Sequence, residues 1–477
     1  MTIDFKSEVE KRKEVFLQDL IALLKINSER NDEEANGEFP FGPGPSLAML
    51  EFLKIAHKDG FKTANFENYV GEVHYGQGEE TLGIFVHADV VPAGQGWTNP
   101  PYEPTLREGR LYARGVLDNK GPALATYYAL KILKEAGVPF YKKVNFIIGT
   151  DEESGWKDMA YYLSKVQLPD FGFSPDARFP VVNGEKSNLT EYLHFGHKND
   201  GDFILHDFRS GIQENCVPEE AKTLITSPLD LKVDFEKYLK KNRKKNRLEG
   251  RFAKTGAKTS LQIKGKSAHS STPEIGENAA TYLAKFLAAY DFGADAQKFL
   301  EVAGQKLHQD FEGKNIGIAY EDEDMGKLSV NPSVFHFAED GQENKIALNI
   351  RHPKGLTEQD IQERLSKHLT AFIQKVSISA LINYQPHYLS PEDPLVQVLL
   401  STYREHTGDD SPPQTVGGGT YGRLMKRGVA YGALFPDSAF TMHQTDEHIK
   451  LEELYKAIEI YTDAIYRLVC VKDEKNA

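Results

Sequence analysis

An apolar run early in the chain ends in two polar side chains that a buried strand does not normally carry. Residues 82–86 read LGIFV, without alternation of apolar and polar positions, and the chain continues as His87-Ala88-Asp89. A strand without alternation is typical of the centre of a sheet that is covered on both faces. Residues two apart in an extended chain point to the same side, so His87 and Asp89 would lie together. They would lie at the carboxyl end of this strand, where open α/β sheets bind ligands.

Strand-like and helical segments alternate on both sides of this run. KKVNFIIG and GVAYGALFP predict further strands, and PALATYYALKILKEAG, which starts at Pro122, predicts a helix. This alternation is the signature of a doubly wound, mostly parallel sheet in the α/β class. About two hundred residues from Asn188 instead contain alternating segments such as KTSLQIKGK and KIALNIRHP, which predict an α+β domain with an antiparallel sheet. We therefore expect an α/β domain of residues 1–187 and 385–477, interrupted by an inserted domain of residues 188–384.

Length, charge and hydropathy exclude several classes of protein. A chain of 477 residues is too long for one ordinary core. A formal net charge of −13 argues against a nucleic-acid partner, which requires a basic face. The basic stretch KKNRKKNRLEGRFAK therefore predicts a solvated helix or hairpin. The apolar runs are too short to span a bilayer, and the first twenty residues lack the apolar core of a signal peptide, so we expect a cytoplasmic protein without a membrane partner.

Side chains with metal-binding or acid–base chemistry follow several other predicted strands and turns. Each has an ordinary structural interpretation when it is taken alone, as a turn residue or the cap of a helix. If these strands share one sheet, however, their carboxyl ends meet at one crevice, and the side chains meet there as well. The stretches are ARGVLDNKGP with Asp118, IIGTDEES with Asp151, Glu152 and Glu153, FSPDARFP with Asp176, and ALFPDSAFTMHQTDEH with His443.

This set offers imidazole and carboxylate groups but no thiols. The two cysteines, Cys216 and Cys470, provide neither a disulfide framework nor a thiolate cluster. Nitrogen and oxygen donors suit Zn²⁺ or Mn²⁺. Two such ions that share one bridging carboxylate would activate a water molecule and polarise a carbonyl group together. A carboxylate left over would take the proton of that water.

At these motifs the chain resembles a family of dinuclear-zinc amidohydrolases and peptidases. The family includes carboxypeptidase G, aminoacylase, carnosinase and succinyl-diaminopimelate desuccinylase. HADVVP, RGVLDNKGP, GTDEES, SPDARFP and MHQTDE occur in the family order and cover essentially the whole chain. The length, the large insertion, FGPGP, GQGW and GGGTYGR are most similar to the bacterial PepV-type dipeptidases.

The resemblance implies a role for each motif residue. Asp89 would orient His87, and Glu152 would be the general base. The family usually has Asp-Asp or Asp-Met where this chain has Asp118-Asn119; the second position is not a ligand, so we expect no loss of function. The metal ligands would be His87 and Asp176 for one ion, His443 and Glu153 for the other, and Asp118 as the bridge between them.

The resemblance also implies that the inserted domain is a lid that completes the site. KGKSAHSSTPEIGENAA resembles the lid motif whose histidine, here His269, donates a hydrogen bond to the tetrahedral oxyanion. Asn215 and Arg351 match lid positions that hold the substrate's carboxylate and backbone, and a guanidinium can bind both oxygens of a carboxylate. Further donors to that carboxylate are expected in the loop VGGGTYGR, from Gly418, Gly419 and Thr420.

The function that this resemblance implies is that of a dipeptidase dependent on two divalent ions, with zinc expected and manganese the alternative. Its substrates would be small dipeptides, including β-alanyl dipeptides such as carnosine. An N-acyl-amino-acid deacylase with the same metal ligands is one alternative, and a non-catalytic peptide-binding protein is another. Relatives with a lid of about half this size dimerise through it, and the partner supplies the lid histidine. The insertion here is large enough to replace a second lid, so we expect a monomer.

Overall fold

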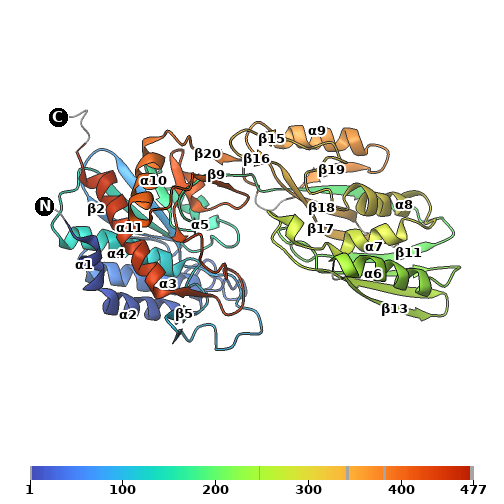
Figure 1. The fold of residues 1–477 in the computed structure, drawn as a ribbon, viewed down its shortest axis with the longest axis horizontal. Helices are drawn as coiled ribbons and strands as arrows, with labels where there is room; N and C mark the ends of the chain where they lie inside the picture. The colour runs from blue at the N-terminus through green and yellow to red at the C-terminus, as the bar shows by residue number, and fades with distance from the viewer. Residues whose placement is uncertain (1–2, 247, 340–342, 380–382, 473–477) are drawn as a thin grey trace. The chain divides into compact units, whose positions relative to one another are not determined.

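The structure, a computed structural model, describes residues 3–246, 248–339, 343–379 and 383–472 and separates into two compact units (Figure 1). Unit 1 contains Met1–Gly184, Tyr388–Gln414 and Thr420–Ala477. Unit 2 contains Glu185–His387 and Thr415–Gly419. The short segment Thr415–Gly419 differs from the expectation, which kept residues 385–477 in one domain. Each unit has its own hydrophobic core.

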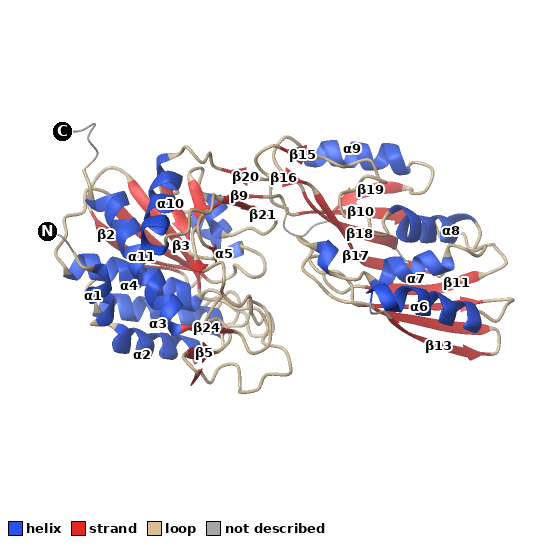
Figure 2. Cartoon of the chain, viewed as in Figure 1, coloured by secondary structure: helices blue, strands red, loops and turns tan. Residues whose placement is uncertain are grey.

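The core of unit 1 contains a mixed sheet (Figure 2). Its strands are β1 (Lys62–Phe66), β2 (Val70–Gly76), β3 (Thr81–His87), β6 (Lys143–Gly149), β7 (Phe171–Ser174), β9 (Val182–Glu185), β20 (His387–Tyr388), β21 (Gln414–Val416) and β22 (Gly428–Ala430). The central strands are parallel and lie in the order β6-β3-β7-β22. Antiparallel strands extend the sheet on both sides, β2 and β1 beyond β6 and β9 beyond β22. The predicted α/β class is confirmed, with the parallel pairing concentrated at the centre.

Helices cover both faces of this sheet. On one face, Phe146 of β6 packs against Phe52 and Tyr127, which lie on different helices. Neighbouring residues of a strand point to opposite faces, so Ile147 faces the other side. On that other face, Glu72 of β2, which lies opposite Ile147 in the sheet, accepts a hydrogen bond from Tyr162 of a third helix. The helices of unit 1 are α1 (Phe5–Glu10), α2 (Lys13–Leu24), α3 (Pro43–Lys58), α4 (Lys120–Glu135), α5 (Lys157–Leu163), α10 (Pro394–Thr407) and α11 (Leu451–Ile465), with a 3₁₀ turn at Tyr421–Leu424 and a π-helical end at Tyr466–Cys470.

Short strands at the edge of unit 1 organise the loops that carry the predicted ligands. β24 (His448–Lys450) pairs with β5 (Arg110–Tyr112), which pairs in turn with β4 (Thr105–Arg107). β8 (Ala177–Arg178) pairs with β23 (Ala433–Leu434). These pairings place β8 directly after Asp176 and β24 shortly after His443.

Unit 2 is built on an antiparallel sheet in the order β13-β14-β12-β11-β17-β18-β10-β19 (Figure 2). These strands are β10 (Leu189–Phe195), β11 (Ile204–Ser210), β12 (Glu220–Thr226), β13 (Glu249–Thr255), β14 (Lys258–Lys264), β17 (Ser329–Ala338), β18 (Asn344–Arg351) and β19 (Lys375–Ile378), and β15 (Glu321–Asp322) pairs separately with β16 (Gly326–Lys327). The helices α6 (Lys232–Asn246), α7 (Ala279–Leu287), α8 (Ala294–Glu301) and α9 (Glu358–Leu369) pack beside this sheet, and α8 continues into a π-helical turn at Val302–Lys306. The predicted α+β character of this region is therefore present.

Helix starts illustrate where local sequence signals succeed and where they do not. α9 begins after Thr357, which forms a capping box with Asp360. Pro273 and Glu274 resemble the start of a helix, but Pro273–Ile275 form a separate 3₁₀ turn and α7 begins only at Ala279. Asn278 then caps α7 by accepting a hydrogen bond from the backbone of Thr281. Within the described residues, no helix combines the length and the apolar character that a membrane span requires.

Candidate active site

The residues predicted as ligands and base in unit 1 come from segments that meet at one edge of its sheet. β3 ends at His87, and Glu152 and Glu153 follow β6 within four residues. Asp176 follows β7 by two residues. Because β3, β6 and β7 are parallel neighbours, their carboxyl ends lie at the same edge.

A single carboxylate lies between two imidazoles in this cluster. Asp118, in the turn before α4, has its Oδ1 3.1 Å from His87 Nε2. Its Oδ2 lies 2.9 Å from His443 Nε2. Each oxygen of Asp118 therefore faces a different histidine, which is the arrangement that a bridging carboxylate requires.

Each imidazole also has a second carboxylate beside it. Asp176 Oδ2 is 3.6 Å from His87 Nε2, and Glu153 Oε2 is 3.2 Å from His443 Nε2. The ligand atoms of His87, Asp118 and Glu153 lie within 4.8 Å of one another. The same holds for His87, Glu152 and Asp176, so the predicted ligands and base lie in one cluster.

Burial and crowding of the carboxylates dominate the electrostatics of this cluster. Burial, with repulsion from Asp176, Glu153 and Asp118, raises the pKa of Glu152 well above its usual range. Burial and the nearby charge of Asp118 raise the pKa of Glu153 to about 7 and raise that of Asp176 as well. Burial opposes ionisation of Asp118 too, but hydrogen bonds from His443 and His87 keep its pKa below the usual value. Close carboxylates with raised pKa values indicate a place that favours added positive charge.

The donor atoms of this cluster fit a pair of divalent metal ions. Two imidazole nitrogens and several carboxylate oxygens form a nitrogen and oxygen set suited to Zn²⁺ or Mn²⁺. Glu153 Oε1 is buried and, among the described residues, has no hydrogen-bond partner. A buried carboxylate oxygen normally has a partner, and a metal ion would supply one.

Asp89 supports more of the cluster than sequence reasoning proposed. His87 Nδ1 lies 3.0 Å from the main-chain oxygen of Asp89 and 3.5 Å from its carboxylate Oδ1. The two carboxylate oxygens accept hydrogen bonds of 3.1 and 3.0 Å from the backbone N–H groups of Glu152 and Glu153. Asp89 therefore contacts one predicted ligand and also fixes the loop that carries the predicted base.

Other residues near the cluster have partners that the sequence did not reveal. Asn119 Nδ2 donates to Pro175 O at 2.8 Å and to Asp176 Oδ1 at 3.2 Å, so this side chain positions Asp176. Trp156 Nε1 donates to the backbone oxygen of Glu152 at 2.8 Å. The only sequence signal for either residue is its place next to a ligand motif.

Asp151 is an acidic residue of the same stretch, IIGTDEES, with a different environment. It is buried, and its Oδ1 lies 2.6 Å from Arg30 Nη1. Its Oδ2 accepts a hydrogen bond from the backbone of Lys157 at the start of α5. These contacts give Asp151 a structural role in the loop after β6.

The predicted lid residues of unit 2 lie close to one another within that unit. The backbone oxygen of Asn215 accepts from Ser270 N at 2.9 Å. Arg351 Nη2 donates to Ser270 Oγ at 3.3 Å, and Arg351 Nε donates to Asn349 Oδ1 at 2.9 Å. His269 precedes Ser270 and pairs with Cys216 in an isolated bridge. Gly418 and Gly419 belong to unit 2 and Thr420 to unit 1.

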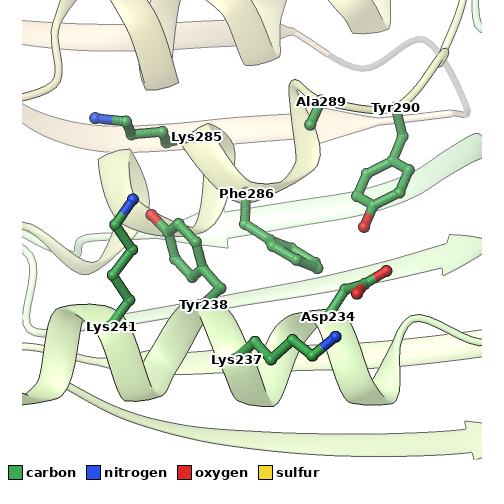
Figure 3. A pocket seen from close by; sticks show the side chains of 8 residues that line it. All are labelled: Asp234, Lys237, Tyr238, Lys241, Lys285, Phe286, Ala289 and Tyr290. Atoms are coloured by element: carbon green, nitrogen blue, oxygen red, sulfur yellow. The ribbon is translucent and has the colours of Figure 1, made fainter.

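A surface hollow of about 280 Å³ lies between α6 and α7, among residues other than the predicted lid residues (Figure 3). It is lined by Asp234, Lys237, Tyr238, Lys241, Lys285, Phe286, Ala289 and Tyr290. The amine of Lys285 extends away from the ring of Phe286. Lys241 belongs to the basic stretch that predicted a solvated helix or hairpin, and the described part of that stretch forms the end of α6 and the strand β13.

The comparisons with known proteins identify the family. Residues 83–467 match the peptidase family M20/M25/M40. This chain belongs to that family. Over 482 aligned residues, which cover 100% of both chains, it is 40% identical to the Beta-Ala-Xaa dipeptidase of Lactobacillus delbrueckii subsp. lactis. The family resemblance inferred from the motifs is confirmed.

Solved structures of the family share the fold. A crystal structure of an M20 family metallo-carboxypeptidase from Sulfolobus solfataricus matches with a TM-score of 0.56 and 19% identity, covering 94% of this chain and 98% of that one. Human carnosine dipeptidase 1 matches with a TM-score of 0.54 and 14% identity, covering 97% and 98%. At these identities the similarity supports the fold alone.

Proposed function

We propose that this chain is a metal-dependent dipeptidase that uses two divalent ions, with Zn²⁺ preferred over Mn²⁺. The observation that carries the proposal is the position of Asp118, whose two oxygens face His87 at 3.1 Å and His443 at 2.9 Å. His87 and Asp176 would hold one ion, and His443 and Glu153 the other. The full-length relative at 40% identity, named a Beta-Ala-Xaa dipeptidase, supports dipeptides as the substrate class.

A pair of bound divalent ions would lower the pKa of a water molecule and polarise the substrate's carbonyl group. The protein's part in hydrolysis then falls mainly to Glu152. Its carboxylate accepts the proton of the attacking water as the water oxygen adds to the carbonyl carbon, and it returns that proton to the amine that leaves when the C–N bond breaks. Asp89 and Trp156 hold the backbone of Glu152 in place for this transfer.

We assign the lid residues to substrate recognition. His269 would donate a hydrogen bond to the oxyanion, a role in which one donor typically contributes on the order of 10²–10³ in rate. Arg351 is buried, and its guanidinium suits the substrate's carboxylate. Asn215, Gly418, Gly419 and Thr420 would supply further donors around the dipeptide.

Substrate screening and metal depletion together test this function. The metal-free protein is prepared with a chelator and then supplied with Zn²⁺ or Mn²⁺, and products from dipeptides, β-alanyl dipeptides and acetyl- or succinyl-amino acids are measured by mass spectrometry. We expect activity to vanish with the metal, to return with either ion, and to be highest on dipeptides. Preferential cleavage of acyl-amino acids would identify a deacylase instead, and full activity without metal would refute the metal site.

A further inference from the structure

One acidic residue of the MHQTDEH motif has no role in the proposed chemistry although it is fully buried. Glu447 lies four residues after His443 and has 0% of its surface exposed. Its Oε1 accepts hydrogen bonds from Leu117 N at 2.8 Å and from Asp118 N at 3.2 Å. Its Oε2 accepts from Gly115 N at 3.2 Å and from Arg114 Nη1 at 2.6 Å. The carboxylate therefore binds the backbone of the turn that carries Asp118.

The segment that contains Glu447 and the segment before Asp118 are also joined by main-chain pairing. Ala113 N donates to Glu447 O at 3.1 Å. One residue further, His448 of β24 is the registered partner of Tyr112 of β5. The loop that carries His443 and the turn that carries Asp118 are thus connected through Glu447 by both main-chain and side-chain bonds.

Arg114 extends this connection to a third loop. Its side chain is buried, and Nη1 also donates to Gln444 O at 3.3 Å. Nη2 donates to Pro92 O at 3.3 Å and Ala93 O at 3.4 Å, in the loop that follows His87 and Asp89. The guanidinium carbon lies 5.2 Å from the ring centroid of Trp97 in the same loop.

We propose that Glu447 and Arg114 form a positioning pair that sets the spacing of His87, Asp118 and His443 for metal binding. The inference rests on the proposed metal site but assigns neither residue as a ligand. A carboxylate suits this position because both oxygens only accept hydrogen bonds, and the groups around them are all donors. A glutamine side chain at this position would turn its amide N–H groups toward one pair of these donors, which would then lose their acceptor. The three ligand segments would then lose part of their common anchor.

Glu447→Gln tests the proposal because it changes one atom and removes one acceptor. The affinity of the metal-free full chain for Zn²⁺ is measured by competition with a chromophoric chelator, and the visible spectrum of the Co²⁺-loaded protein is recorded. We expect metal binding about 10–100-fold weaker, as is typical when the support of a ligand is removed. The cobalt spectrum should change, and turnover should recover in excess metal.

A matched control separates positioning from general stability. Glu72 is also a buried carboxylate of unit 1, but its partners are Tyr162, His74 and Asn145, outside the ligand loops. Glu72→Gln should lower the thermal midpoint of the metal-free protein and leave the metal affinity within about twofold, because distant sites act independently. Equal loss of metal affinity in both variants would refute the positioning role.

A milder variant keeps the proposal testable if Glu447→Gln does not fold. Arg114→Lys retains the positive charge beside Glu447 but cannot reach the same carbonyl groups at once. It should weaken metal binding in the same direction by a smaller factor. Wild-type metal affinity and an unchanged cobalt spectrum in a folded variant would overturn the inference. Wild-type protein that binds no metal would instead refute the proposed function.

Discussion

At the scale of single residues, the neighbours Glu152 and Glu153 have the same side chain but different surroundings. Glu153 Oε2 faces His443, whereas Glu152 lies with His87 and Asp176, and burial raises the pKa of both carboxyl groups. Glu152→Gln should lower turnover by about 10²–10⁴-fold while bound metal and dipeptide affinity persist. Glu153→Gln should lose a metal ion and regain part of its activity in excess metal. Metal content and turnover of both variants decide this, and the opposite pattern would reverse the assignment.

The sequence revealed the side chains of the cluster better than the bonds that hold them. His87, Asp118 and His443 stand out because each lies in a motif after a predicted strand or before a helix, and such positions meet at one sheet edge. Glu447 did not stand out, although it lies in the same motif as His443. Its partners are mainly backbone N–H groups, and every residue except proline carries one, so a sequence pattern does not mark them. The sequence likewise did not indicate that Asn119 donates a hydrogen bond to Asp176.

At the scale of elements, His308 links the packing of unit 2 to pH. It follows the π-helical end of α8, lies 3.1 Å from Thr281 Oγ1 and packs edge-on against Tyr282 of α7. Burial, with a smaller effect of the nearby Lys285 charge, lowers its pKa from 6.5 to about 4. The unfolded chain therefore takes up this proton first as the pH falls. The contribution of His308 to the free energy of unfolding is fully present above about pH 6.5. It is lost progressively as the pH falls to about 4, by roughly 3 kcal/mol in total.

The variant His308→Gln isolates this contribution, because glutamine keeps a hydrogen-bonding group without a titrating ring. The difference in thermal midpoint between wild type and variant should change between pH 7 and pH 5, in the direction that favours the variant at low pH. His197→Gln, at an exposed position, is the matched control for replacing a histidine by glutamine. A pH-independent difference for His308→Gln would contradict the prediction.

Element boundaries were harder to predict than element types, and the reason is visible in α7. Pro273 and Glu274 are good signals for a helix start, yet they form a separate 3₁₀ turn. The bridge between Lys266 and Glu277 closes the loop that contains this turn, and Asn278 then caps the helix. A bond between positions eleven residues apart is a tertiary constraint, and local propensity does not contain it.

At the scale of the whole molecule, one chain contains both halves of the proposed chemistry. The predicted metal ligands and base lie in unit 1, and His269, Asn215 and Arg351 lie together in unit 2. We therefore propose that a monomer is catalytically complete and that no partner subunit supplies a histidine. Specific activity should stay constant when the protein is diluted through any self-association that light scattering detects.

Complementation provides the sharper form of this last prediction. Glu152→Gln and His269→Ala each remove one half of the proposed machinery, from different units of the chain. If each site is built from a single chain, a mixture of the two inactive variants should show no more activity than the sum of the separate proteins. Recovery of activity on mixing, up to about a quarter of the wild-type value for random dimers that share sites, would show that the lid histidine acts in a neighbouring subunit. Loss of wild-type activity in step with dissociation would lead to the same conclusion.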